Sequence, residues 1–161
     1  MAKSVDKPIR LYVLAIFVVV AYGLMPFVSV FFVSKREAFL VGLRTLPFNG
    51  SILFLYDAEG NANIVLIFVS LFLCIFSAAS AIWAFYGDVA GRIATLLFVT
   101  LNVVWWTGIV LYAIANGEND APDKLGWIFQ LIVPPIWLGF IWWNFTRSDI
   151  NAYYKFKSES K

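Results

Sequence analysis

Apolar residues along this chain gather in long blocks. Four runs contain no Asp, Glu, Lys or Arg; they cover 11–33, 64–86, 93–115 and 125–145. Each run is about as long as the ~20 residues that an α-helix needs to cross roughly 30 Å of hydrocarbon. A soluble helix would instead show one apolar stripe beside a polar face. The pattern therefore predicts an all-α integral membrane protein, with four transmembrane helices in a single membrane domain, 1–161.

The longest interruption of this pattern is the segment 34–63, between the first and second runs. It contains a partly apolar piece, 38–56, which is long enough to be considered as a fifth span. Arg44, Pro47 and the turn-prone Asn49 argue against a span, because together they would leave backbone polar groups unpaired in lipid. We expect a short amphipathic helix followed by a strand or hairpin, either on the membrane surface or packed on the helices.

The other connections are shorter and more polar. The turn 87–91 is so tight that the two runs on either side of it must form neighbouring antiparallel helices. The loop 116–124 is acidic, and the tail 146–161 is basic and polar. We expect Tyr153, Tyr154 and Phe156 of this tail to rest against lipid headgroups.

The distribution of basic residues predicts the orientation of the four spans. The amino end, the turn after the second run and the tail lie on one side, and they hold eight of the 12 basic residues; the other side holds Lys35, Arg36, Arg44 and Lys124. Because cytoplasmic loops are enriched in Lys and Arg, both termini are predicted to be cytoplasmic. Lys35 and Arg36 directly follow the first run and argue the other way.

The composition narrows the chemistry that this chain can perform. It has no histidine, which removes the commonest metal ligand and the usual acid–base group. Its one cysteine, Cys74, lies inside an apolar run, where a small buried residue is expected. A net charge of +2 does not indicate the strongly basic surface that nucleic-acid binding requires. We therefore expect no enzymatic activity, no cofactor and no nucleic-acid partner.

Polar residues within the apolar runs are the first candidates for a site, because a polar group in lipid usually needs a partner. Asn102 and Gln130 lie in adjacent runs and are the obvious pair. Pro134 and Pro135 predict a kink in the fourth span, whose freed carbonyl groups either amide could bind. Two interpretations follow: a structural hydrogen bond, or a substrate site.

Aromatic and small residues give a second set of candidates. Trp105 and Trp106 fall near the middle of the third run, where anchoring at the membrane interface does not explain them. They either line a pocket for an aromatic, quinone or lipid ligand, or fill space beside small residues of another helix. The small residues at 77–81 permit such close packing, within the chain or with a partner.

The segment 141–154, at the end of the last run, resembles the closing signature of domain-of-unknown-function family 2569. It has an aromatic residue at Trp143, a branched residue at Ile150 and an aromatic end at Tyr154, and the order of spans and loops is similar. The resemblance implies a small four-span protein of the bacterial inner membrane; it brings no activity and no functional residue. The segment departs from the family pattern at Arg147, Asp149 and Tyr153.

These observations predict a non-enzymatic membrane protein that acts by binding. Its expected partners are the lipid bilayer and other membrane subunits or a second copy of itself, as an accessory or assembly factor of a larger complex. One alternative is a small oligomeric transporter or channel, with its path near Asn102, Gln130, Pro134 and Pro135. The other is a lipid- or quinone-binding protein that uses Trp105 and Trp106.

Overall fold

The computed structural model describes residues 6–24, 63–115 and 124–159, without the side chains of residues 113 and 124–130. Every regular element in these ranges is a helix, which confirms the all-α prediction for the described part of the chain. The interpretations of 34–63 and of the acidic loop 116–124 concern residues that, apart from 63 and 124, lie outside the described ranges. The helices are α1 (Ile9–Val18), η1 (Val19–Leu24), α4 (Ile64–Phe85), α5 (Val89–Ala115), α6 (Lys124–Phe145) and α7 (Ser148–Glu159).

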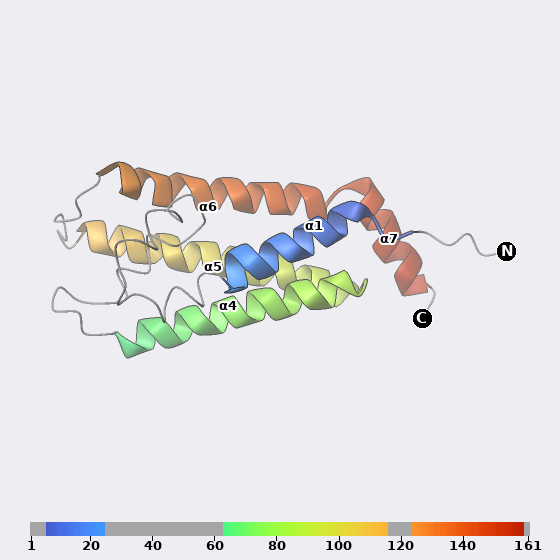
Figure 1. Ribbon diagram of the computed structural model, residues 1–161, viewed down its shortest axis with the longest axis horizontal. Helices are drawn as coiled ribbons and strands as arrows, with labels where there is room; N and C mark the ends of the chain where they lie inside the picture. Colours follow the sequence, from blue (N-terminus) through green and yellow to red (C-terminus); the bar gives the residue numbers. More distant parts are fainter. Residues whose placement is uncertain (1–5, 25–62, 116–123, 160–161) are drawn as a thin grey trace.

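The long helices form a bundle, and α7 crosses one end of it (Figure 1). Helix α5 packs against both α4 and α6, while α1 and its continuation η1 pack against α4, and α1 also contacts α6. The rings of Phe17 on α1 and Trp137 on α6 lie with their centroids 4.7 Å apart. The amino-terminal helix therefore closes the bundle on the side where α4 and α6 do not meet extensively.

Two helices, Ile64–Phe85 and Val89–Tyr112, are long and apolar enough to cross a membrane. Two further apolar helices, Ile9–Leu24 and Leu131–Phe145, are shorter. Large apolar side chains point away from the bundle; Phe68 of α4 is 69% exposed and Val104 of α5 is 62% exposed. Large apolar side chains are exposed at many positions along both helices, which is unusual in soluble monomers. It supports lipid as the surroundings of these helices.

The predicted tight hairpin is confirmed between α4 and α5. Helix α4 ends at Phe85, and the turn after it contains Gly87, whose φ of +83° is the left-handed conformation that glycine adopts without strain. Asp88 then begins α5, because its Oδ1 accepts a hydrogen bond of 2.9 Å from the backbone N–H of Ala90. A Cβ on Gly91 would lie 2.6 Å from the backbone nitrogen of Ala84, so only glycine permits the two helices to approach this closely.

The interpretation of the tail is wrong for its two tyrosines. Residues Ser148–Glu159 form the amphipathic helix α7, and Ile150, Tyr153 and Tyr154 are buried against the bundle rather than placed at headgroups. The hydroxyl of Tyr154 donates a 2.7 Å hydrogen bond to the carbonyl oxygen of Ala84 in the last turn of α4. Burial of an aromatic ring together with a paired hydroxyl explains why this short helix docks.

Candidate functional site

Asn102 of α5 lies at the centre of the described polar contacts inside the bundle. Its side chain is completely buried. The Nδ2 group donates hydrogen bonds to the carbonyl oxygen of Tyr22 in η1, at 3.3 Å, and to Oγ of Ser77 in α4, at 3.2 Å. One amide therefore joins three helices.

The amino-terminal partner of this amide lies in an unusual stretch of backbone. Val19–Leu24 is a π-helix, a wider turn that appears mostly in short pieces within α-helices. Its Gly23 lies against α4, where an added Cβ would come within 2.7 Å of Ala78 Cβ. The π-helix and a small residue thus bring the Tyr22 carbonyl close to α4 and α5.

The amide oxygen of Asn102, the thiol of Cys74 and the hydroxyl of Ser80 do not take part in the described hydrogen bonds between these three helices. Oδ1 of Asn102 makes no hydrogen bond to any described residue, and the buried thiol of Cys74 lies beside the same side chain. Oγ of Ser80 donates to the carbonyl oxygen of Ser77 at 3.0 Å, which uses a hydroxyl inside its own helix. The small-residue segment of α4 therefore packs inside the chain, as one of the two interpretations predicted.

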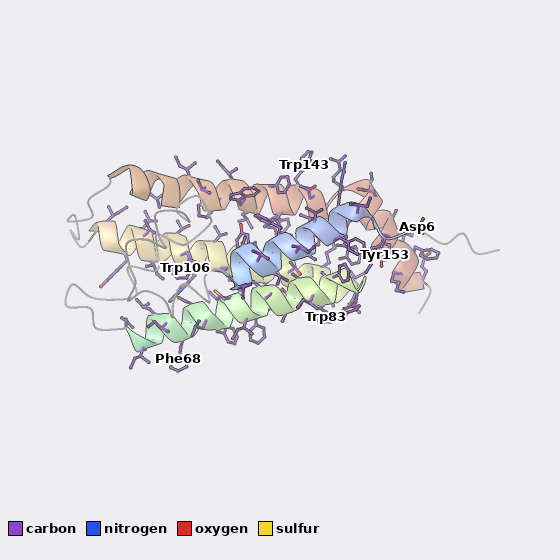
Figure 2. All side chains as sticks on the ribbon, in the orientation of Figure 1. Asp6, Phe68, Trp83, Trp106, Trp143 and Tyr153 are labelled. Carbon is purple, nitrogen blue, oxygen red and sulfur yellow. The ribbon has the colours of Figure 1, made fainter. Side chains whose placement is uncertain are left out.

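Trp105 and Trp106 have different surroundings in the structure. Trp105 is half-buried, and its Nε1 donates a 3.0 Å hydrogen bond to Oγ of Ser70 in α4. Ser70 in turn donates to the carbonyl oxygen of Leu66, so both groups are paired. Trp106 is 1% exposed and belongs to the main hydrophobic core. Figure 2 shows this ring within the bundle. Both rings therefore contribute to packing between helices.

The remaining candidates lie in α6. Pro134 is buried and Pro135 is exposed, and the helix continues through both. The side chain of Gln130 is outside the described part, so its pairing with Asn102 stays a prediction. The hydrogen bonds of Asn102 that the structure gives go to η1 and α4. Farther along α6, Trp142 ties the helix to α5 through a 3.1 Å bond from its Nε1 to Oγ1 of Thr100.

This arrangement is better suited to positioning helices than to catalysis or metal binding. The described polar atoms of the candidate site are amides, hydroxyls and an indole, none of which carries charge near neutral pH. Within the described ranges, no three His, Cys, Asp or Glu residues form a group that could hold a metal ion. What the site can do is fix the rotation and spacing of α5 relative to α4 and η1.

Ser70 and the Tyr22 carbonyl were missed by reasoning from the sequence. A backbone carbonyl carries no sequence signal, and a serine in an apolar run commonly bonds its own helix. The π-helix has no sequence signature in Val19–Leu24 either. The packing of η1, α4 and α5 against one another decides which polar residues meet.

No protein-family model, curated protein or solved structure matches this chain. The resemblance of 141–154 to domain-of-unknown-function family 2569 stays a prediction.

Proposed function

We infer that this chain is a four-span, non-enzymatic membrane protein that serves as an accessory or assembly partner of a membrane complex. The observation that carries the proposal is the use of candidate-site groups in bonds between helices: Asn102 to Tyr22 and Ser77, and Trp105 to Ser70. Groups used to hold helices together are poorly placed to coordinate a moving solute. Among the described residues, the outer surface of the bundle is then the part available to recognise a partner.

The charge distribution supports the proposed orientation, with both termini in the cytoplasm. Arg10 of α1 lies 3.7 Å from Asp149 of α7, and Arg92 of α5 lies over the Tyr154 ring. These contacts gather charged side chains from α1, α5 and α7 at a single end of the bundle. Exposed Trp143 lies towards the same end of α6 (Figure 2). Interfacial Trp with Lys and Arg beyond it is the usual pattern at a cytoplasmic membrane face.

The outer face of α4 supports a role in binding. Phe72 and Phe76 are 51% and 40% exposed, and their ring centroids are 4.2 Å apart. The Phe76 ring also lies 5.1 Å from that of Phe98 on α5. A surface of aromatic rings in contact across two helices offers a larger and more rigid contact than scattered aliphatic residues. A partner's transmembrane helix would find this surface pre-ordered.

The test is purification from native membranes in mild detergent at endogenous expression, followed by mass spectrometry of copurifying proteins and lipids. We expect a protein partner in stoichiometric amount with the wild-type chain. The variant Phe72→Ala/Phe76→Ala should lose it. The matched variant Val13→Ala/Ile16→Ala, which shortens exposed residues of α1 instead, should retain it.

Three other outcomes would contradict the proposal or favour one of its alternatives. A chain recovered only as a monomer, without a stoichiometric partner, would contradict the proposal. A homo-oligomer that passes ions or small solutes in liposomes, with flux altered by Asn102→Leu, would favour the transporter. A bound quinone or lipid lost on Trp105→Ala would favour the ligand-binding alternative.

A further inference from the structure

Two arginines from different parts of the chain share one carboxylate at the end of the bundle. Nη1 of Arg10, in α1, lies 3.7 Å from Oδ2 of Asp149, in the first turn of α7. Nε of Arg147, which directly precedes α7, lies 4.0 Å from Oδ1 of the same carboxylate. We call these three residues the arginine site. Two guanidinium charges that face one carboxylate leave the site with a surplus of positive charge.

The two guanidinium groups keep hydrogen-bond donors for a further anion. Their separations from Asp149 exceed the limit of about 3.2 Å for an ordinary N–H···O bond, so the carboxylate holds them loosely. The central carbon of the Arg147 guanidinium lies 5.1 Å from the centroid of the Trp143 ring. A guanidinium that rests on an aromatic ring by its face still presents the N–H groups along its edge. Because the Arg10 and Arg147 side chains are 50% and 37% exposed, an anion from outside can reach both.

An apolar surface continues from the arginine site along the seam between α1 and α6. The ring centroids of Phe17 and Trp137 lie 4.7 Å apart across this seam, and those of Trp137 and Phe140 lie 5.7 Å apart on α6. Val13 on α1 and Trp143 on α6 are both exposed. Figure 2 shows Trp143 towards the α7 end of α6. The seam therefore combines apolar surface with positive charge at one end.

We propose that the arginine site binds the phosphate of an anionic phospholipid, whose acyl chain lies along the α1–α6 seam. Two guanidinium forks match the oxygens of a phosphate, and basic pockets between transmembrane helices bind anionic headgroups. The surplus of positive charge disfavours a zwitterionic lipid, because the cationic group of its headgroup would be repelled. The apolar seam favours a lipid over free phosphate, since each buried CH₂ group of an acyl chain adds affinity. This site is independent of the protein partner proposed for the outer face of α4.

Asp149 is the anion with which a lipid phosphate competes. Its side chain is 44% exposed, so water and salt weaken its attraction to the two arginines. Removal of its charge should therefore strengthen lipid binding. If the ion pairs served only to hold α7, the same change would not strengthen lipid binding. Asp149 thus distinguishes an anion site from a structural contact.

The experiment uses the full chain reconstituted in nanodiscs of equal phosphatidylglycerol and phosphatidylcholine. After transfer to mild detergent, native mass spectrometry counts the lipids of each class that stay bound. We expect the wild type to retain phosphatidylglycerol preferentially, and Asp149→Asn to raise that preference about threefold. Arg10→Gln/Arg147→Gln should lower it about tenfold or more, since each basic residue near an anionic surface is worth roughly fivefold.

Lys155→Gln is the matched control for Arg147→Gln, because each removes one positive charge. Lys155 is exposed and lies roughly 10 Å along α7 from its first residue. Arg147→Gln should lower the preference about fivefold, whereas Lys155→Gln should change it by less than about twofold. Circular dichroism verifies that each variant keeps its helices. An equal loss in these two variants would overturn the proposal, as would a preference that Asp149→Asn leaves unchanged or lowers, or equal retention of both lipids by the wild type.

Inorganic phosphate separates the two sources of this chemistry. Millimolar phosphate should leave the phosphatidylglycerol preference within about twofold, because it lacks the acyl chains that would lie along the seam. If phosphate alone abolishes the preference, the arginine site binds free phosphate and the lipid assignment is wrong.

Discussion

The interior around Asn102 and the end under α7 hold the helices together by different means. In the interior, uncharged groups meet over 3.0 to 3.3 Å, and Asn102 and Ser77 are fully buried. At the end, the Arg10–Asp149 pair is about half exposed on both sides. Exposed ion pairs contribute little and are screened by salt. At the end, the buried tyrosines, and not the ion pairs, should therefore hold α7.

This difference predicts that the interior and the end of the bundle respond independently to pH, salt and substitutions. Water reaches the end of the bundle, so pH and salt can change its contacts. The described polar groups around Asn102, in contrast, do not titrate near neutral pH. Geometry should dominate the interior and the helical hairpin, because displaced backbone has no room to relax there. The following changes test this division, from the largest expected effect to the smallest.

Gly91→Ala should have the largest effect, destabilising the chain by about 3 kcal/mol. The added Cβ would lie 2.6 Å from the Ala84 nitrogen and 2.7 Å from the Trp83 carbonyl carbon, both backbone atoms. The α4–α5 hairpin must then open. The measurement is unfolding by sodium dodecyl sulfate in mixed micelles, followed by circular dichroism.

Gly108→Ala is the matched control on the same helix, since nothing lies within 4 Å of a Cβ there. It should be neutral or stabilise α5 by up to about 1 kcal/mol through helix propensity. Equal destabilisation by both substitutions would mean that helix packing at Gly91 is not the cause.

Asn102→Leu should cost about 2 kcal/mol, because it removes two bonds between helices, each worth up to ~1.7 kcal/mol in a membrane protein. It also leaves the Tyr22 carbonyl without the Asn102 donor. The same detergent titration measures the loss. Thr107→Val is the control: Oγ1 of Thr107 is buried without a hydrogen bond to any described residue, so its removal should cost little. A larger loss for Thr107→Val would contradict the central place of Asn102.

Sequence reasoning predicted the elements of the interior better than its contacts. The apolar runs located α4, α5 and α6 because their length and lack of charge are local properties. The same reasoning selected Asn102 because a polar residue in an apolar run needs a partner. It paired that residue with Gln130, on the basis of adjacent runs, whereas the described bonds reach back to Tyr22 and Ser77.

The end of the bundle was harder to predict for a related reason. The α7 segment is too polar to show an apolar run, so it was interpreted as a tail on lipid headgroups. Its docking depends on Tyr154 meeting the Ala84 carbonyl, 70 positions earlier in the chain. Such a contact depends on where α4 ends relative to α6. The local sequence pattern does not predict how the ends of these two helices lie relative to each other.

Tyr154→Phe should weaken docking of α7 by about 1 kcal/mol, the usual value of one hydrogen bond. The ring remains, but the 2.7 Å bond to Ala84 is lost. Hydrogen exchange of the α7 amides measures the change. Tyr86→Phe is the control, because the Tyr86 ring is 69% exposed. We expect faster exchange in α7 for Tyr154→Phe alone. Unchanged exchange would show that this hydrogen bond does not stabilise the docking of α7.

The pH dependence of docking follows from the same residue. Burial raises the pKa of Tyr154, against the opposing effect of nearby Arg92. Because the neutral phenol is the docked form, the contribution is complete below pH ~10, the ordinary tyrosine value. It is lost as pH rises above that value and through the raised pKa. Protection of α7 should therefore fall in strong alkali, while amides near Asn102 stay protected. Loss of both together would break the proposed independence.

The smallest effect concerns Trp105 and Ser70, joined by a 3.0 Å bond between α5 and α4. A double-mutant cycle of Trp105→Phe and Ser70→Ala should give a coupling of about 0.6 kcal/mol, the average for such bonds in membranes. Pairing Trp105→Phe with Ser80→Ala provides the control, since Ser80 donates within α4 as Ser70 does, whereas the described hydrogen bond of Trp105 goes to Ser70. A coupling near zero for Ser70 would show that Trp105 acts by ring packing alone. The interior would then depend on Asn102 for its described bonds between helices.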